Sequence, residues 1–161
     1  MDEIKYTRLF NHPNMVTCFE VYDYRIYIVL VIEYVDGGTL KTKLDKQGTL
    51  TVKEAVGIMQ DILEALSYIH SLNFVHRDLK PSNIMFATDK NKLTGKTAET
   101  LKLVDYGLCG NLKDRSPNSL IHDKCGTLGY LAPELLGKRG KDEFYGEKVD
   151  VFSAGILFFE M

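Results

Sequence analysis

The sequence predicts an α+β fold, because it contains both helix-spaced apolar positions and short runs rich in β-branched residues. Residues 51–72 place apolar side chains at the spacing of one helix face. Residues 25–33 form a β-branched run bounded by polar residues, which is typical of a buried strand. Shorter strands are predicted at Phe74–Val75, 84–86 and 101–104.

The elements of the first half follow from local signals. Residues 2–10 predict the end of a helix, which stops near Pro13 because proline disfavours helical geometry in the residue before it. Residues 15–22 predict a strand. The long helix begins with a capping box, in which the Thr51 side chain accepts from the amide of Glu54 and the Glu54 carboxylate reaches back.

The second half of the chain carries weaker patterns. The polar stretch 87–100 is longer than the usual hairpin connection, so we expect an exposed loop there. Residues 107–131 predict irregular structure. Residues 148–161 are very apolar and predict the start of a buried helix.

Composition indicates a soluble globular protein. The chain has 161 residues, enough for one domain, with 45% hydrophobic and 26% charged residues. A net charge of -2 gives no electrostatic reason to expect a nucleic-acid partner. No apolar run reaches the about 18 residues of a membrane span. The three cysteines are too scattered for a disulfide framework or a zinc site and favour reduced thiols, so we expect a cytoplasmic protein, with the nucleus left open.

The stretch HRDLKPSN at residues 76–83 carries the candidate chemistry. Phosphoryl transfer needs a group that orients the attacking hydroxyl, cations for the phosphates and ligands for a metal ion. Asp78 can accept the hydroxyl proton, Lys80 can face the phosphoryl group, and Asn83 can offer an oxygen to Mg²⁺. The alternative is that Asp78 and Asn83 only build an Asx-type turn in a surface loop.

Three further motifs follow in order: Asp105-Tyr106-Gly107, Ala132-Pro133-Glu134 and then Asp150. Together with residues 76–83, the series resembles the signature set of the eukaryotic protein kinase family, and the resemblance covers essentially the whole chain. It implies a partial bilobal kinase fold. Residues 1–35 would then be a remnant of the small lobe with the hinge, and residues 36–161 a portion of the large lobe.

The resemblance implies ATP and Mg²⁺ as cofactors. Asp78, Lys80 and Asn83 would be the catalytic residues, and Asn83 and Asp105 would hold the metal. Glu3 would be the helix glutamate that pairs with a nucleotide-binding lysine, although an exposed helix charge is the alternative for this residue.

The same resemblance implies an adenine site. The backbone of Glu33, Tyr34 and Val35 would form the hinge that receives the base. Ile32 would precede the hinge as the gatekeeper, and Met85 would lie under the adenine ring.

The chain departs from the family pattern in two respects. Upstream of Glu3 the family has a glycine-rich loop and the lysine of its third strand, and downstream of Met161 it has further helices; this chain shows neither. Tyr106 replaces the usual phenylalanine, in a place between His76 and positions that align with Thr7 and Cys18. A buried phenol needs a hydrogen-bond partner, and we expect that Thr7 could supply one.

The predicted function is a protein serine/threonine kinase. Lys80 and the pair Gly126-Thr127 resemble serine/threonine-directed members, and the overall style resembles the calcium/calmodulin-dependent kinases. The partners implied are ATP, a protein with a target serine or threonine, and a regulatory domain outside the chain. The alternative is a truncated or pseudokinase interaction module without catalysis. Intact Asp78 and Asp105 favour the enzyme, whereas the missing lysine predicts that residues 1–161 alone are inactive.

Overall fold

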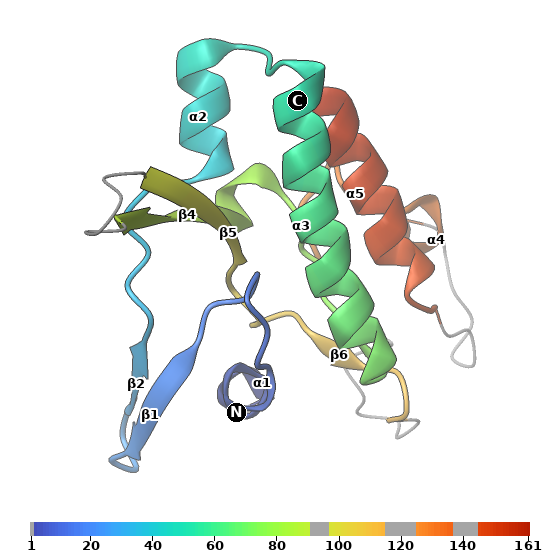
Figure 1. Ribbon diagram of the computed structural model, residues 1–161. Helices are drawn as coiled ribbons and strands as arrows, with labels where there is room; N and C mark the ends of the chain where they lie inside the picture. The colour runs from blue at the N-terminus through green and yellow to red at the C-terminus, as the bar shows by residue number, and fades with distance from the viewer. Residues whose placement is uncertain (1, 91–96, 115–124, 137–144) are drawn as a thin grey trace.

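The computed structural model describes residues 2–90, 97–114, 125–136 and 145–161. Helices and short antiparallel sheets pack against one another, with α1 beside β1 and α2 beside β4 (Figure 1). The helices are α1 (Asp2–Leu9), α2 (Leu40–Gln47), α3 (Val52–Ser71), α4 (Pro133–Leu136) and α5 (Lys148–Glu160). The strands are β1 (Cys18–Asp23), β2 (Ile28–Ile32), β3 (Phe74–Val75), β4 (Ile84–Lys90), β5 (Thr97–Leu103) and β6 (Gly110–Asn111).

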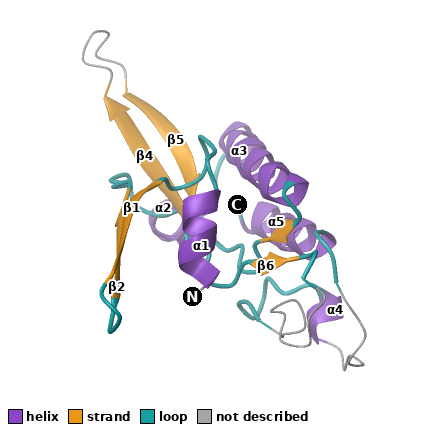
Figure 2. Ribbon diagram, turned by 90° about the horizontal axis from the view of Figure 1, so that it is seen from below, coloured by secondary structure: helices purple, strands orange, loops and turns teal. Residues whose placement is uncertain are grey.

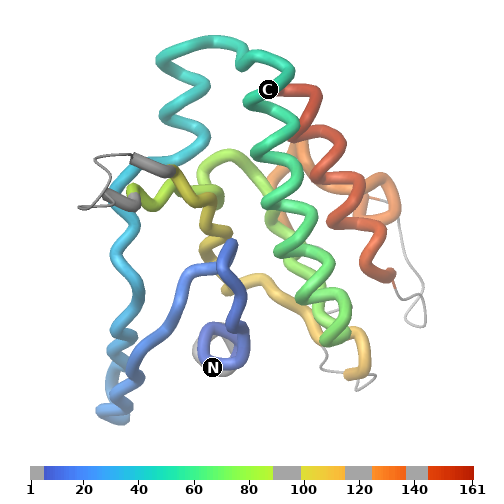
Figure 3. The backbone as a smooth tube through the Cα atoms, viewed as in Figure 1, coloured from blue at the N-terminus to red at the C-terminus, as the bar shows by residue number. Residues whose placement is uncertain are grey.

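The predicted long helix is confirmed as α3. Thr51 and Glu54 form the expected capping box, which satisfies amides at the start of the helix. One face of α3 is apolar and fully buried, because it packs against α5, β3 and β5. Figure 1 shows α3 and α5 side by side, and Figure 3 shows the backbone of α5 returning to the start of α3. At that point the Leu50 amide donates to the Met161 carbonyl at 2.7 Å.

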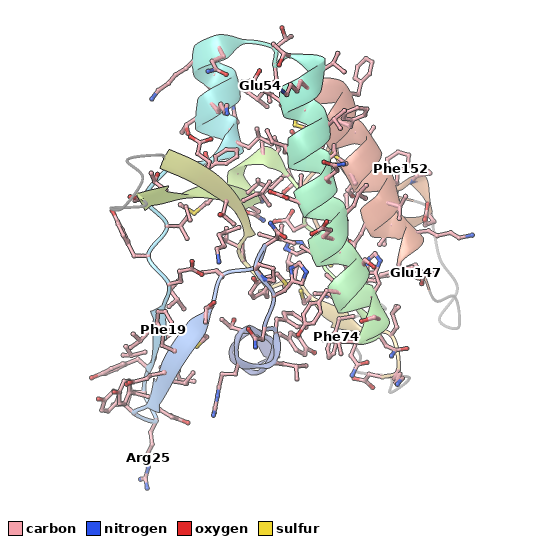
Figure 4. The ribbon with its side chains drawn as sticks, in the orientation of Figure 1. Phe19, Arg25, Glu54, Phe74, Glu147 and Phe152 are labelled. Atoms are coloured by element: carbon pink, nitrogen blue, oxygen red, sulfur yellow. The ribbon has the colours of Figure 1, made fainter. Side chains whose placement is uncertain are left out.

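The strands β1 and β2 pair antiparallel, but the prediction of a buried strand at residues 25–33 is wrong. β2 spans only Ile28–Ile32, and most side chains of both strands are exposed. Among the described elements, the main neighbour of this sheet is α1, which contacts β1, so β-branched composition alone does not bury it. Phe19 of β1 is 64% exposed, and Figure 4 shows Arg25, in the turn between the two strands, pointing away from the rest of the chain.

Of the loop expected at residues 87–100, the described residues 87–90 and 97–100 are strand, and residues 91–96 lie outside the described part of the chain. β4 continues to Lys90 and β5 begins at Thr97, with pairs that include Thr88 with Glu99. The backbone ladder supplies the stability here, and threonine favours strand geometry even where the hydrophobic pattern is weak. Figure 2 shows this hairpin extending away from the pair of helices α3 and α5.

Two short pairings bring the site together. β3 pairs with β6, so the described residues of the region 107–131, predicted as irregular, include a short strand; residues 115–124 of this region lie outside the description. Met15 lies outside β1 and forms an isolated parallel bridge with Leu103. These contacts hold the segment after β5 between the α1–β1 connection and the loop after β3. None of the described helices combines the length and apolar character needed to cross a bilayer.

Two leucines of α3 test where the core lies. Leu66 is 2% exposed and Leu63 is 47% exposed. We expect Leu66→Ala to lower the free energy of unfolding by about 2–5 kcal/mol, because it leaves a cavity. Leu63→Ala should cost less than about 1 kcal/mol. Urea denaturation of both variants measures the difference, and equal losses would contradict this packing.

Candidate active site

The loop after β3 places a carboxylate, an ammonium and a hydroxyl in mutual contact. The Lys80 Nζ donates to the Asp78 Oδ2 at 2.7 Å and to the Thr127 Oγ1 at 2.9 Å. The Thr127 hydroxyl donates to the Asp78 Oδ1 at 2.6 Å. These three contacts form a closed triangle, which we call the Asp78–Lys80–Thr127 triangle. It fixes the rotamers of all three side chains.

The triangle keeps Asp78 ionised. Burial raises the pKa of Asp78, but the hydrogen bonds from Lys80 and Thr127 outweigh burial and leave this pKa below its usual value. The neighbouring imidazole is neutral, because burial lowers the pKa of His76. Its Nδ1 accepts from the Asp78 amide at 3.3 Å. A charged carboxylate beside a neutral imidazole is the state expected at neutral pH.

Asn83 is oriented by the same aspartate. Its Nδ2 donates to the Asp78 backbone carbonyl at 3.0 Å and to the Asp78 Oδ2 at 3.1 Å. A short 3-10 turn, Pro81–Asn83, places this side chain inward, and Pro81 suits the first position of such a turn. The Asn83 Oδ1 has no hydrogen-bond partner within the described part of the chain.

Asp150, in the first turn of α5, stabilises the loop after β3 through hydrogen bonds. Its fully buried carboxylate accepts from the His76 amide and the Arg77 amide, both at 2.8 Å. The His70 Nε2 lies 2.8 Å from the same carboxylate. Arg77 has a φ of 69°, a left-handed conformation that costs a non-glycine residue about 1–3 kcal/mol. Hydrogen bonds to a charged acceptor are strong enough to hold it there.

An apolar pocket of about 460 Å³ lies next to this loop. Segments that are far apart in the sequence line the pocket, and most of their lining side chains are apolar. The lining residues are Thr7, Val16, Leu30, Ile32, Glu33, Tyr34, Val35, Met85, Val104, Asp105 and Tyr106. The structure therefore brings together Glu33, Val35, Met85 and Asp105, as the sequence suggested.

The connection between β2 and α2 offers backbone groups to the pocket. Among the described residues, no hydrogen bond engages the Glu33 carbonyl or the Val35 amide and carbonyl. Val35 is nevertheless buried, and buried backbone groups are normally paired. This edge of the pocket can therefore accept and donate hydrogen bonds to a planar ligand.

The side chain of Glu33 has another role. Its Oε1 lies 2.9 Å from the Lys102 Nζ, and its Oε2 accepts from the Thr17 amide at 3.2 Å. Lys102 is a buried lysine of β5 that the sequence analysis did not select. The sequence held no signal for its burial, because a lysine that alternates with the buried Leu101 and Leu103 on a strand is expected on the opposite, solvent-facing side. The ion pair fixes the connection that lines the pocket.

Asp105 and Asn83 lie on adjacent segments. The Val104 amide donates to the Asn83 backbone carbonyl at 3.0 Å, so the residue before Asp105 contacts the turn that carries Asn83. Asp105 itself is exposed, has a φ of 66° and accepts from the Gly107 amide at 3.2 Å. Its carboxylate therefore remains accessible at the pocket.

The structure places Tyr106 in the core and Glu3 in α1. Tyr106 is buried as expected, but its hydroxyl bonds with backbone groups of Val16 and Leu103, and not with the Thr7 hydroxyl that we suggested. Glu3 lies in α1, and its side chain lies outside the described part of the structure. Thr127 was not among the predicted catalytic residues, because the pair Gly126-Thr127 was interpreted as a mark of substrate class; its contacts with Asp78 and Lys80 appear only in the structure.

Fold and site together define a protein kinase domain. A family model described as "Protein kinase domain" matches residues 1–161, and the chain belongs to this family. The α+β, kinase-like fold predicted from the sequence is confirmed.

The chain is similar to several curated kinases. It is 38% identical over 157 residues to CBL-interacting protein kinase 11 of Oryza sativa subsp. japonica, covering 98% of this chain and 29% of that protein. It is 35% identical over 156 residues to calcium/calmodulin-dependent protein kinase type 1 of Macrobrachium nipponense, covering 97% and 41% respectively. The chain thus spans well under half the length of these relatives.

Gly126 allows the triangle to form. A Cβ at this position would lie 2.5 Å from the Arg77 carbonyl oxygen, and its φ is +116°. Gly129 also has a positive φ, +98°, but no described heavy atom lies within 4 Å of its Cβ position.

This pair gives a matched test. Gly129→Ala should cost about 1–2 kcal/mol of unfolding free energy from the backbone conformation alone. Gly126→Ala adds a steric conflict worth about 1–3 kcal/mol more, because a backbone atom must move. Urea denaturation compares the two variants. Equal costs would show that the approach to Arg77 is not tight.

Proposed function

We propose that the protein is a serine/threonine kinase that transfers the γ-phosphoryl group of ATP to protein hydroxyls. The observation that carries the proposal is the Asp78 carboxylate, which accepts hydrogen bonds from Lys80 and Thr127 beside a pocket that Asp105 lines. A carboxylate in this state can accept the proton of an attacking hydroxyl while the pocket holds the nucleotide.

The residues present suit ATP and Mg²⁺. Mg²⁺ binds through one or two protein oxygens together with substrate phosphates, and does not need a dedicated protein cage. The exposed Asp105 carboxylate and the Asn83 Oδ1 are two such oxygens on adjacent segments. Mg·ATP, when bound, supplies the transferable phosphoryl group and the positive charge of the metal.

The adenine would lie in the apolar part of the pocket. Val35 and Met85 would contact the faces of the base, and the unpaired Glu33 carbonyl and Val35 amide would bond its edge. Under this proposal residues 1–35 contribute to the small lobe and residues 36–161 to the large lobe. The role of Glu3 in nucleotide binding remains part of the proposal.

The chain's own groups prepare the hydroxyl for transfer. Asp78 orients the serine or threonine hydroxyl and takes its proton on a carboxylate oxygen. Lys80, already 2.7 Å from Asp78, places a positive charge beside the transferred group. The contact of Lys80 with Thr127 ties both residues to the segment before α4, where we propose that the substrate peptide lies.

The relatives support the serine/threonine class. A protein of Dictyostelium discoideum that carries the name serine/threonine-protein kinase is 35% identical over 159 residues, covering 99% of this chain and 17% of that protein. We propose an intracellular location, where ATP is available and the three free cysteines stay reduced. A regulatory domain outside the chain is also part of the proposal.

Two aspartates separate the assigned roles. In the full-length protein, Asp78→Asn should lower kcat about 10²–10⁴-fold, because the group that takes the hydroxyl proton is lost, while nucleotide affinity changes little. Asp105→Asn should weaken Mg²⁺-dependent nucleotide binding. The measurement is phosphate transfer from radiolabelled ATP to serine, threonine and tyrosine peptides, with nucleotide binding by calorimetry.

Asp45→Asn is the control, because Asp45 is an exposed residue of α2 that pairs with Lys41. It should behave as wild type. An Asp78→Asn variant at the wild-type rate would contradict the assignment. Wild-type protein that binds Mg·ATP but transfers nothing to any peptide would instead support an interaction module.

A further inference from the structure

We propose that the Tyr106 hydroxyl is a positioning group that holds Asp105 at the pocket, by fastening the segment after β5 to the connection between α1 and β1. Tyr106 follows Asp105 directly, so a restraint on its ring limits where the carboxylate can lie. The inference deepens the proposed function, because it rests on Asp105 as a metal ligand. Its central measurement, however, does not require catalysis.

The hydroxyl belongs to a closed set of three hydrogen bonds. It donates to the Leu103 carbonyl at 2.8 Å and accepts from the Val16 amide at 3.0 Å. The Val16 amide also donates to the Leu103 carbonyl, at 3.1 Å. The phenol therefore joins a backbone hydrogen bond that already links two distant segments. It adds a side-chain anchor without leaving either backbone group unpaired.

The linked segments are themselves well held. The Leu103 amide donates to the Asn14 carbonyl at 2.8 Å, and Met15 bridges Leu103 in parallel register. The Asn14 Nδ2 donates to the Leu101 carbonyl at 3.2 Å. Residues 14–16 and the end of β5 thus form one rigid unit. The hydroxyl of Tyr106 hydrogen-bonds directly to that unit, at Val16 and Leu103.

The ring is enclosed as tightly as the hydroxyl. Tyr106 is 1% exposed, and its ring meets Phe10 edge-on at 5.3 Å and His76 edge-on at 6.2 Å between centroids. Burial raises the pKa of Tyr106 far above its usual value, so the hydroxyl keeps its proton and remains a donor. The anchor is therefore present throughout the physiological pH range.

Asp105 has little to hold it otherwise. Its side chain is exposed and its backbone has a positive φ. Within the described part of the chain, the hydrogen bond of its carboxylate is a local one, accepted from the Gly107 amide at 3.2 Å. A phenylalanine ring would fill the same space as Tyr106 but would lack the bonds to Val16 and Leu103. With tyrosine at position 106, hydrogen bonds as well as packing restrain the position of Asp105. With phenylalanine, packing alone would do so.

The test compares two variants that each lose one phenol oxygen. Tyr106→Phe removes the proposed anchor. Tyr68→Phe is the control, because its hydroxyl accepts from the Asn11 amide at 3.0 Å, a similar bond away from Asp105. Hydrogen–deuterium exchange of residues 105–109 is followed in the full-length protein without ligands. We expect about three- to ten-fold faster exchange in Tyr106→Phe and unchanged exchange there in Tyr68→Phe.

A second measurement uses Mg²⁺ titration at fixed ATP. In Tyr106→Phe the apparent Mg²⁺ affinity should fall about three- to ten-fold, while kcat at saturating Mg²⁺ stays within about two-fold, since the ligands themselves remain. A general loss of folding stability would not lower the apparent Mg²⁺ affinity while leaving kcat unchanged. Tyr68→Phe should leave both quantities at the wild-type value.

The outcomes are distinct. Wild-type exchange in Tyr106→Phe, or equal acceleration in both variants, overturns the inference. Faster exchange confined to Tyr106→Phe supports it. If that exchange difference appears while the wild-type protein transfers no phosphate, the positioning role stands and the proposed function fails.

Discussion

The Asp150 carboxylate accepts hydrogen bonds from the consecutive amides of His76 and Arg77, and the rest of the site depends on this contact. It holds Arg77 in a left-handed conformation, which turns the chain so that Asp78 points toward Lys80 and Thr127. Because Asp150 is in α5 and α5 packs on α3, the helical core sets the position of the loop. Without this carboxylate two buried amides would be unpaired.

Much of the fold could be predicted because its signals are local. The helix α3 carries both its cap at Thr51 and its apolar periodicity within its own residues. The hairpin of β4 and β5 could not be predicted, since its outer half depends on backbone pairing between polar residues. The exposure of β2 could not be predicted either, because the composition of a strand does not reveal whether another element covers it.

Some residues of the candidate site could likewise be predicted from the sequence, whereas others could not. Asp78, Asn83 and Asp105 belong to short motifs, so their types and order identified them. The Glu33–Lys102 ion pair and the backbone partners of Tyr106 join residues that only the folded chain brings together. The notion that Thr7 would satisfy the phenol followed from alignment of side chains alone. In the structure, the phenol bonds with the backbone groups of Val16 and Leu103, which lie beside its hydroxyl.

The Asp78–Lys80–Thr127 triangle has a consequence for how this sequence can drift. Thr127 and Asp78 are 49 residues apart, yet each member of the triangle contacts both of the others. Loss of one member removes two of the three contacts and leaves one hydrogen bond between the remaining pair. Substitutions at these three positions should therefore be non-additive in their effects, so that the cost of each depends on which residues occupy the other two positions.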